Sequence, residues 1–207
     1  MLPEIYKLRI GNQEIADSRN IKYYFVEDKP SKNVINQVTV ISTDDFLKLD
    51  SGNKYFTTAV GEPSSREKIS KYLLRNGVRA ISIQQSNSIV YESSSVGQGS
   101  ILCSNSIVTA NSNIGDFFHL NIFSYVAHDC IIGNYVTFSP QVSCSGNVII
   151  GDNVFIGTGA IIRPGTTTNP LVIGSGSVIG MGSVITKSIP DKSLVYGNPA
   201  KVVKKLD

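Results

Sequence analysis

Apolar residues recur at a strict period of six through the second half of the chain. Stepping by six meets Val90, Val96, Leu102, Val108, Ile114, Leu120, Val126, Ile132, Phe138, Cys144, Ile150, Ile156 and Ile162, all of them apolar. An α-helix repeats every ~3.6 residues and a strand every ~2, so neither element explains this period. A short flat strand followed by a turn does, and we predict a chain of such units.

A longer period closes these units into coils. Val96-Gly97, Ile114-Gly115, Ile132-Gly133 and Ile150-Gly151 recur at intervals of eighteen residues, so three units make one coil with a triangular cross-section. Stacked coils lie about 4.8 Å apart, and the apolar columns fill the interior. After Ile162 the frame slips by five residues and resumes at Ile173, which predicts an inserted loop. The pattern indicates a parallel β-helix but does not fix its hand, for which the usual crossover rule favours right-handed.

The first 83 residues differ in composition from the rest. They carry thirteen Lys or Arg and ten Asp or Glu, whereas residues 84–207 carry six of each sign. Aromatic and β-branched runs alternate there with one helical pattern, in which Ser64 and Glu67 have the spacing of a capping box. We predict strands at 21–26, 55–60 and 79–83 and a helix at 64–75. The expected organisation is a small α/β domain at 1–83 followed by the β-helix domain at 84–207.

Composition excludes several classes of protein. A net charge of +3 is too weak for a nucleic-acid or membrane-surface binder. We find no targeting segment and no run of ~18 apolar residues, and we expect a cytoplasmic protein. The cysteines Cys103, Cys130 and Cys144 are odd in number and form no CxxC pair, so neither a disulfide framework nor a metal site is expected. Neither GxSxG nor GxGxxG occurs, which leaves a serine hydrolase or a dinucleotide-binding motif unsupported.

His128 is the residue that most suggests chemistry. It falls two residues after a column residue, at a predicted corner where its side chain can project. A neutral imidazole there can act as a general base, and Asp129 can hold its second ring nitrogen. Gly146 lies one coil further on, where a bare backbone N–H can face an oxyanion. The alternative is a solvated corner histidine; for His119, which follows two phenylalanines, we expect a packing role.

Charge is unevenly distributed along the β-helix. No Lys or Arg occurs from Ala80 to Ile162, so we expect an uncharged side of the prism to pack against copies of itself. Conversely, five lysines lie in the last 21 residues. They indicate either a solvated tail or a polyphosphate site, with Lys201 the best candidate for the latter.

Residues 114–130, 179–190 and 197–201 resemble the left-handed β-helix acyltransferases with hexapeptide repeats. Within this family the chain is similar to the N-acetyltransferases of nucleotide-linked 4-amino-4,6-dideoxyhexoses and to the related sialic acid O-acetyltransferases. The stretch 114–130 is most similar to GDP-perosamine N-acetyltransferases. The resemblance covers roughly residues 20–203. It departs at residues 8–14, where relatives have a Gly-rich loop and this chain has one glycine.

The resemblance implies a left-handed helix and a homotrimer with active sites between subunits, where acetyl-CoA lies along the prism. It makes His128 the general base, Asp129 the residue that orients it, and Gly146 the backbone donor to the thioester oxygen. The expected substrate-binding residues are Asn121, Asp28 and Gly61. The expected acetyl-CoA-binding residues are Gly157, Arg163, Lys187 and Lys201.

The activity expected from this resemblance is transfer of acetyl from acetyl-CoA to the C4 amine of a nucleotide-linked 4-amino-4,6-dideoxyhexose, in bacterial surface-polysaccharide synthesis such as that of O-antigen. One alternative is an O-acetyltransferase that uses the same His128 on a sialic acid or another hydroxyl acceptor. A second is a non-catalytic β-helix scaffold. GDP, dTDP and UDP all remain open as the nucleotide.

Overall fold

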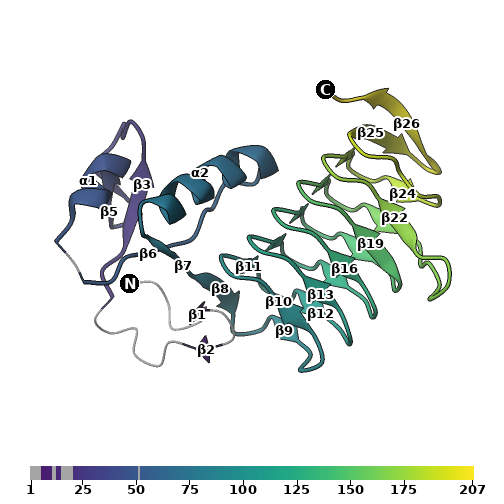
Figure 1. The fold of residues 1–207 in the computed structure, drawn as a ribbon, viewed down its shortest axis with the longest axis horizontal. Helices are drawn as coiled ribbons and strands as arrows, with labels where there is room; N and C mark the ends of the chain where they lie inside the picture. The colour runs from purple at the N-terminus through teal and green to yellow at the C-terminus, as the bar shows by residue number, and fades with distance from the viewer. Residues whose placement is uncertain (1–5, 11–12, 15–20, 51) are drawn as a thin grey trace.

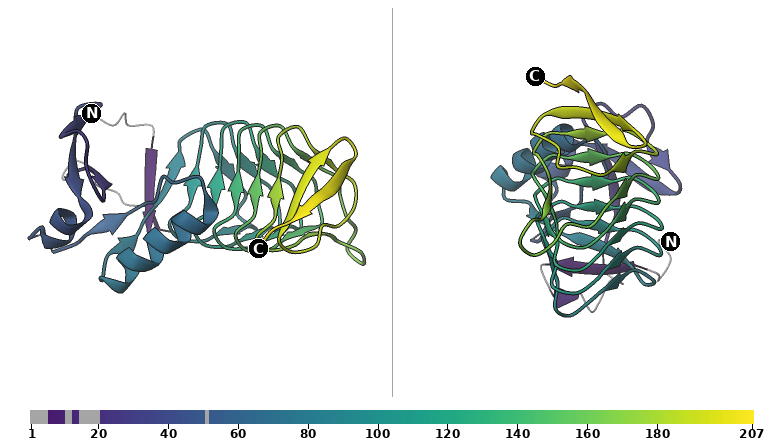
Figure 2. Two further views of the ribbon diagram at one scale, coloured as in Figure 1. Left: turned by 90° about the horizontal axis from the view of Figure 1, so that it is seen from above. Right: turned by 90° about the vertical axis from the view of Figure 1, so that its right-hand side faces the viewer.

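The computed structural model describes residues 6–10, 13–14, 21–50 and 52–207, and its main body is a three-sided prism of stacked coils (Figures 1 and 2). Each coil adds one short strand to each side. Strands on one side are parallel, with partners eighteen residues apart, as in Val126 beside Cys144. The pairing confirms the predicted coil length.

Three sheets form the sides of the prism. The six-stranded sheet contains β9 (Ile89–Val90), β12 (Ile107–Val108), β15 (Tyr125–Val126), β18 (Ser143–Cys144), β21 (Ile161–Ile162) and β24 (Val184–Ile185). The five-stranded sheet contains β10 (Ser95–Val96), β13 (Asn113–Ile114), β16 (Ile131–Ile132), β19 (Val148–Ile150) and β22 (Leu171–Ile173). The ten-stranded sheet contains β2 (Gln13–Glu14), β1 (Tyr6–Ile10), β8 (Ser82–Gln85), β11 (Ile101–Leu102), β14 (His119–Leu120), β17 (Thr137–Phe138), β20 (Phe155–Ile156), β23 (Val178–Ile179), β25 (Ser193–Gly197) and β26 (Ala200–Lys205).

The interior of the prism is apolar, as the period of six predicts. From Leu102 to Ile162 every residue of the column is at most 4% exposed. Burying one such side chain stabilises the fold by roughly 1.5–3 kcal/mol, so the stacked columns are the main source of stability. The inserted loop is also confirmed, because Ile162 pairs with Ile185, twenty-three residues on.

The corners of the prism depend on left-handed backbone. The third residue after a column residue has a positive φ in nine successive units: Asn105, Asn111, Phe117, Phe123, Asp129, Tyr135, Gln141, Asn147 and Asn153. Asn and Asp tolerate this conformation better than other residues that carry a Cβ. Each corner therefore turns sharply and points the residue before it outward.

The N-terminal domain is small and mixed, as predicted, but its elements differ in their bounds. It contains the sheet of β3 (Tyr24–Glu27), β5 (Val38–Ser42) and β4 (Val34–Ile35), the pair β6 (Tyr55–Phe56) and β7 (Arg79–Ala80), and the helices α1 (Thr43–Lys48) and α2 (Pro63–Arg75). The strand expected at 55–60 ends at Phe56, and the one expected at 79–83 is divided between β7 and β8.

The predicted capping box of α2 is wrong. The N-cap is Glu62, whose carboxylate accepts hydrogen bonds from the backbone N–H groups of Ser64 and Ser65 at 2.9 and 2.7 Å. Pro63 fixes the first helical φ and sets the start of the helix one residue early. Glu67 instead pairs with Lys71 and with the amide of Asn153 on the β-helix.

The described residues of the segment 8–14 lie in the strands β1 and β2. β1 runs antiparallel to β8, the first strand of the β-helix, and pairs with β2 on its other side. Gly11, the single glycine of the stretch 8–14 in which the chain departs from its relatives, lies outside the described residues, as does Asn12. Within the described part of the chain, no helix is long and apolar enough to cross a membrane.

Candidate active site

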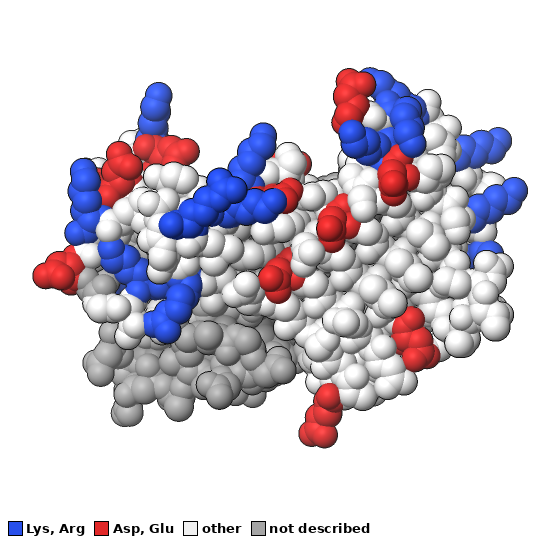
Figure 3. All heavy atoms as spheres, viewed as in Figure 1, with Lys and Arg blue, Asp and Glu red and all other residues white. Residues whose placement is uncertain are grey.

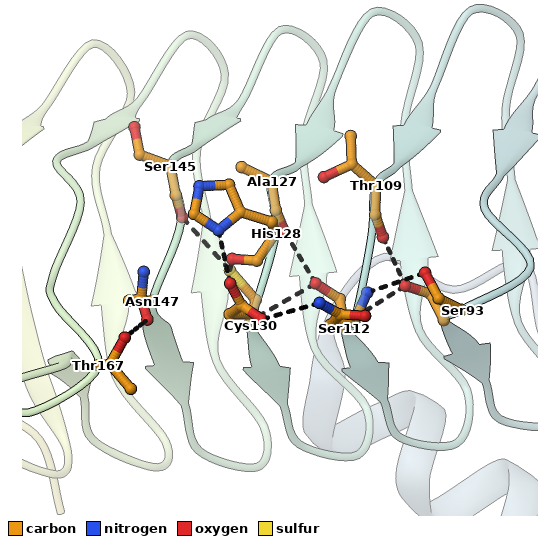
Figure 4. A network of polar contacts seen from close by, with 12 residues as sticks. Ser93, Thr109, Ser112, Ala127, His128, Cys130, Ser145, Asn147 and Thr167 are labelled. Atoms are coloured by element: carbon orange, nitrogen blue, oxygen red, sulfur yellow. Dashed lines mark hydrogen bonds and ion pairs between the residues drawn. The ribbon is translucent and has the colours of Figure 1, made fainter.

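His128 lies on the corner of the prism between the six-stranded and five-stranded sheets (Figure 4). We call this corner the His128 edge. It consists of residues 91–94, 109–112, 127–130, 145–147, 163–170 and 186–188. The next coil places Gly146 on the same edge, and the inserted loop follows one coil further on.

Asp129 holds the imidazole of His128. The positive φ of Asp129, 58°, turns the corner so that its Oδ2 lies 2.7 Å from His128 Nδ1. Asn111, one coil earlier, donates from Nδ2 to Asp129 Oδ1 at 3.2 Å. These hydrogen bonds, the one with His128 first, lower the pKa of Asp129. A carboxylate at Nδ1 favours the tautomer with a bare Nε2, which leaves that nitrogen free to accept a proton.

Gly146 packs directly against the imidazole. A Cβ at this position would lie 2.6 Å from both Cε1 and Nε2 of His128, so any side chain would displace the ring. The N–H groups of Ser145 and Asn147 donate to the carbonyls of Ile162 and His128. Among the hydrogen bonds of the described residues, none uses the Gly146 N–H. A proton acceptor and an open backbone donor therefore lie side by side.

The inserted loop is anchored to the same coil. The N–H of Gly165 donates to the Gly146 carbonyl at 3.1 Å, and the Thr167 hydroxyl lies 3.5 Å from Asn147 Oδ1 (Figure 4). Arg163 Nε donates to the Thr186 carbonyl at 2.6 Å. The loop thus continues the His128 edge toward the C-terminal coils.

The four residues expected at acetyl-CoA fall in different places. Arg163 and the exposed Lys187 lie on the His128 edge, in line with His128 and Gly146. Gly157 lies on the corner between the ten-stranded and six-stranded sheets, where a Cβ would come within 2.6 Å of Met181 N. Lys201 is exposed on β26 in the C-terminal hairpin.

The three residues expected at the sugar nucleotide also lie apart. Asn121 shares its corner with Gly157 and donates from Nδ2 to the Phe138 carbonyl at 2.7 Å. Asp28 follows β3 and accepts a hydrogen bond from Thr43 at 2.7 Å, at the carboxyl end of the parallel pair β3–β5. Ligands commonly bind at this end of parallel strands. The carbonyl of Gly61 accepts from Thr137 on the β-helix at 2.7 Å.

The remaining histidine and the cysteines are structural. His119 is 6% exposed and hydrogen bonds to the Thr58 carbonyl at 3.0 Å. Burial, with the charge of Arg66, lowers the pKa of His119 to about 3, so this ring stays neutral. Cys130 and Cys144 are buried, and Cys103 is half-buried. In the described part of the chain, no three His, Cys, Asp or Glu side chains gather as a metal site.

Two contacts at this edge were missed by the sequence reasoning. Asn111 precedes Asp129 by eighteen residues, so the coil period alone could have identified it as a neighbour. The contact of the loop with Gly146 had no such signal, because the inserted residues break the period.

Comparison with known proteins places this geometry in a family. Residues 147–187 match the model of the hexapeptide repeat of succinyl-transferase. The GDP-perosamine N-acetyltransferase of Escherichia coli O157:H7 is 44% identical over 143 residues, which are 68% of this chain and 65% of that protein, slightly under two thirds of its length.

Solved structures agree over most of the chain. WeeI from Acinetobacter baumannii AYE is 43% identical, with a TM-score of 0.85 over 87% of this chain and 85% of its own. The acetyltransferase domain of PglB from Neisseria gonorrhoeae FA1090, in complex with acetyl coenzyme A, is 33% identical, with a TM-score of 0.78 over 87% and 85%. PerB from Caulobacter crescentus, in complex with CoA and GDP-perosamine, is 27% identical, with a TM-score of 0.78 over 83% and 82%.

The β-helix of this family is left-handed, so the right-handed preference of the crossover rule is wrong for this chain. That rule depends on the twist of long strands, and most strands of the prism have only two residues. The stacked hexapeptide coils, the small N-terminal domain and these relatives lead to one conclusion. The chain belongs to the left-handed β-helix acyltransferases with hexapeptide repeats.

Proposed function

We propose that this protein transfers acetyl from acetyl-CoA to the C4 amine of a nucleotide-linked 4-amino-4,6-dideoxyhexose. The observation that carries the proposal is the pair formed by the free Nε2 of His128 and the open N–H of Gly146 on one corner of the prism. The relatives that bind acetyl-CoA, or CoA together with GDP-perosamine, support the choice of substrates. The product would serve the synthesis of a bacterial surface polysaccharide such as O-antigen.

The proposed reaction is a direct transfer. The amine attacks the thioester carbonyl and gives a proton to His128 Nε2, while Asp129 keeps the ring oriented through Nδ1. The Gly146 N–H donates to the oxyanion that forms, a contact worth about 3 kcal/mol in comparable sites. The carbon–sulfur bond then breaks, and the protonated His128 returns its proton to the sulfur, so CoA leaves as the thiol and the imidazole is neutral again. No acyl-enzyme is required, because the deprotonated amine is itself a sufficient nucleophile.

We assign the His128 edge to acetyl-CoA. Arg163 and Lys187 lie along that edge and would meet its phosphates, as would Lys201 on the C-terminal hairpin. Gly157, which the resemblance also placed at acetyl-CoA, is buried against the next coil, so its lack of a side chain serves the packing of the coils and we do not assign it to the cofactor. Figure 3 supports the placement of the phosphate end of acetyl-CoA at the C-terminal coils. Basic side chains gather at that end of the prism and are absent from most of the flank of the prism in view.

We assign residues 1–83 to binding of the nucleotide, with Asp28 and Gly61 in contact with the ligand and Asn121 near the sugar.

We also propose a homotrimer. Exposed apolar residues run along the outer face of the six-stranded sheet, among them Ile89 (51% exposed) and Ile161 (48%). Such a stripe is typical of a subunit interface. Both substrates are metabolites of the cytoplasm, where we expect the protein to act.

The test is release of thiol from acetyl-CoA in the presence of GDP-, dTDP- and UDP-linked 4-amino-4,6-dideoxyhexoses, with sialic acid as a hydroxyl acceptor. Turnover with one amino sugar supports the proposal and identifies the nucleotide. Turnover with sialic acid alone would make the protein an O-acetyltransferase. No turnover and no binding of acetyl-CoA would indicate the non-catalytic scaffold.

A further inference from the structure

Arg66 is a fully buried cation that binds only backbone carbonyls. Its side chain is 0% exposed although it belongs to α2 at the surface of the small domain. Nη1 donates to Val60 and Gly61 at 2.8 and 3.1 Å, Nε donates to Phe117 at 3.0 Å, and Nη2 donates to Tyr135 at 2.6 Å. One guanidinium therefore joins a loop of the N-terminal domain to two successive coils of the β-helix.

Two further side chains hold the same loop from the β-helix. The Thr137 hydroxyl donates to the Gly61 carbonyl at 2.7 Å, and the ring of His119 bonds the Thr58 carbonyl at 3.0 Å. His119 and Thr137 are register partners on adjacent strands β14 and β17, and both are buried. The segment 58–61 is thus held by Arg66, His119 and Thr137, and it ends immediately before the N-cap of α2.

These contacts are specific in a way that the apolar contact between the domains is not. Phe117 and Tyr135 of the β-helix stack with rings 5.1 Å apart and pack with Phe56 and Leu73 of the N-terminal domain. Such a contact tolerates small shifts, whereas four N–H groups in the fixed plane of a guanidinium do not. In the described part of the chain no carboxylate lies within ion-pair distance of Arg66, so its role is not that of a salt bridge.

We propose that Arg66, His119 and Thr137 are positioning residues that fix the sugar-nucleotide-binding domain relative to His128. The inference rests on the proposed function. Because Gly61 lies in the segment they hold, a shift of this loop would displace the sugar amine from His128 Nε2 while leaving the His128 edge unchanged. Misplacement by about 1 Å can cost ~10²-fold in rate. The loss should therefore fall on the nucleotide sugar and not on acetyl-CoA.

The test is steady-state kinetics of Arg66→Lys, Thr137→Val and Thr137→Ser, with Arg75→Lys as the control on the exposed end of α2. Lysine keeps the charge of Arg66 but cannot reach four carbonyls. For Arg66→Lys we expect kcat/KM for the nucleotide sugar to fall about 10-fold to 100-fold, with KM for acetyl-CoA unchanged. For Thr137→Val we expect kcat/KM for the nucleotide sugar to fall about 3-fold, again with KM for acetyl-CoA unchanged. Thr137→Ser should keep the wild-type kcat/KM, because serine retains the hydroxyl group.

A purely structural role would give a different result. Variants that lose activity through the folded fraction alone would lower kcat only in proportion to the fraction that is folded by circular dichroism, with both KM values unchanged. That result, or an equal rise in both KM values, would overturn the positioning role while the proposed function stands. If Arg66→Lys does not fold, the contrast between Thr137→Val and Thr137→Ser decides alone. Absence of wild-type turnover would instead refute the proposed function, and the inference with it.

Discussion

His119 makes the stability of the protein depend on pH. The folded protein holds the ring neutral, because its pKa falls from an ordinary value of 6.5 to about 3 through burial and the nearby charge of Arg66. The unfolded chain binds a proton at the ordinary value and the folded chain does not. Protonation therefore favours unfolding. The stability is complete above pH 6.5 and is lost progressively as the pH falls toward 3.

The size of this effect follows from the two pKa values. At pH ~5 the unfolded chain is almost fully protonated at this ring and the folded chain is not, so about 2 kcal/mol of unfolding free energy is lost relative to pH ~8. The assay is urea unfolding, followed by circular dichroism, of the wild type and of His119→Gln at several pH values. Glutamine keeps an N–H for the Thr58 carbonyl but does not titrate. The wild type should lose about 2 kcal/mol more than the variant over this range.

Two results would refute the reasoning. One is an equal pH dependence of the two proteins. The other comes from nitrogen NMR, which is simple here because the chain has only two histidines. A His119 ring that titrates with a midpoint near the ordinary histidine value would show that it is not held neutral in the fold.

The site and the core give three further predictions. Gly146→Ala places a Cβ against the His128 ring, so turnover should fall ~10²-fold with little change in the thermal midpoint, whereas Ser145→Ala should keep activity. Asp129→Asn keeps a residue that tolerates the positive φ but removes the carboxylate, and kcat should fall by ~10²-fold with the circular dichroism spectrum unchanged. Ile156→Ala leaves a cavity in the column and should cost about 2–5 kcal/mol in urea unfolding. A loss below about 1 kcal/mol would show that the coil collapses around the site.

The repeat made most of the β-helix predictable from the sequence. All residues of a column such as Val126, Cys144 and Ile162 have the same role in the interior, so the apolar period identifies the position of each residue in its coil. The loop after Ile162 was visible as a change of frame in that period. The contact between His128 and Gly146 followed from the same period. The corner backbone had a signal that we did not use, since Asn and Asp occupy five of the nine left-handed positions.

The junction of the two domains could not be predicted in this way. Residues 57–60 belong to the strand predicted at 55–60, but Thr58 and the following Gly61 are bound by side chains that come from sixty and more positions away. Arg66 lies in the helix predicted at 64–75, and only the fold shows that four carbonyls surround its guanidinium. Local propensity depends only on residues that are close in the sequence, so it does not predict contacts with such distant partners.

The central claim is that His128 accepts a proton from the acceptor amine beside Gly146. The most direct measurement is thiol release from acetyl-CoA by the wild type and by His128→Asn, with the nucleotide-linked amino sugar that the wild type prefers at saturation. Asparagine fits the exposed corner, so the coils should remain folded. We predict that kcat falls by ~10²-fold or more while the binding of acetyl-CoA is unchanged. Full turnover by the variant would contradict the account and remove His128 from the mechanism.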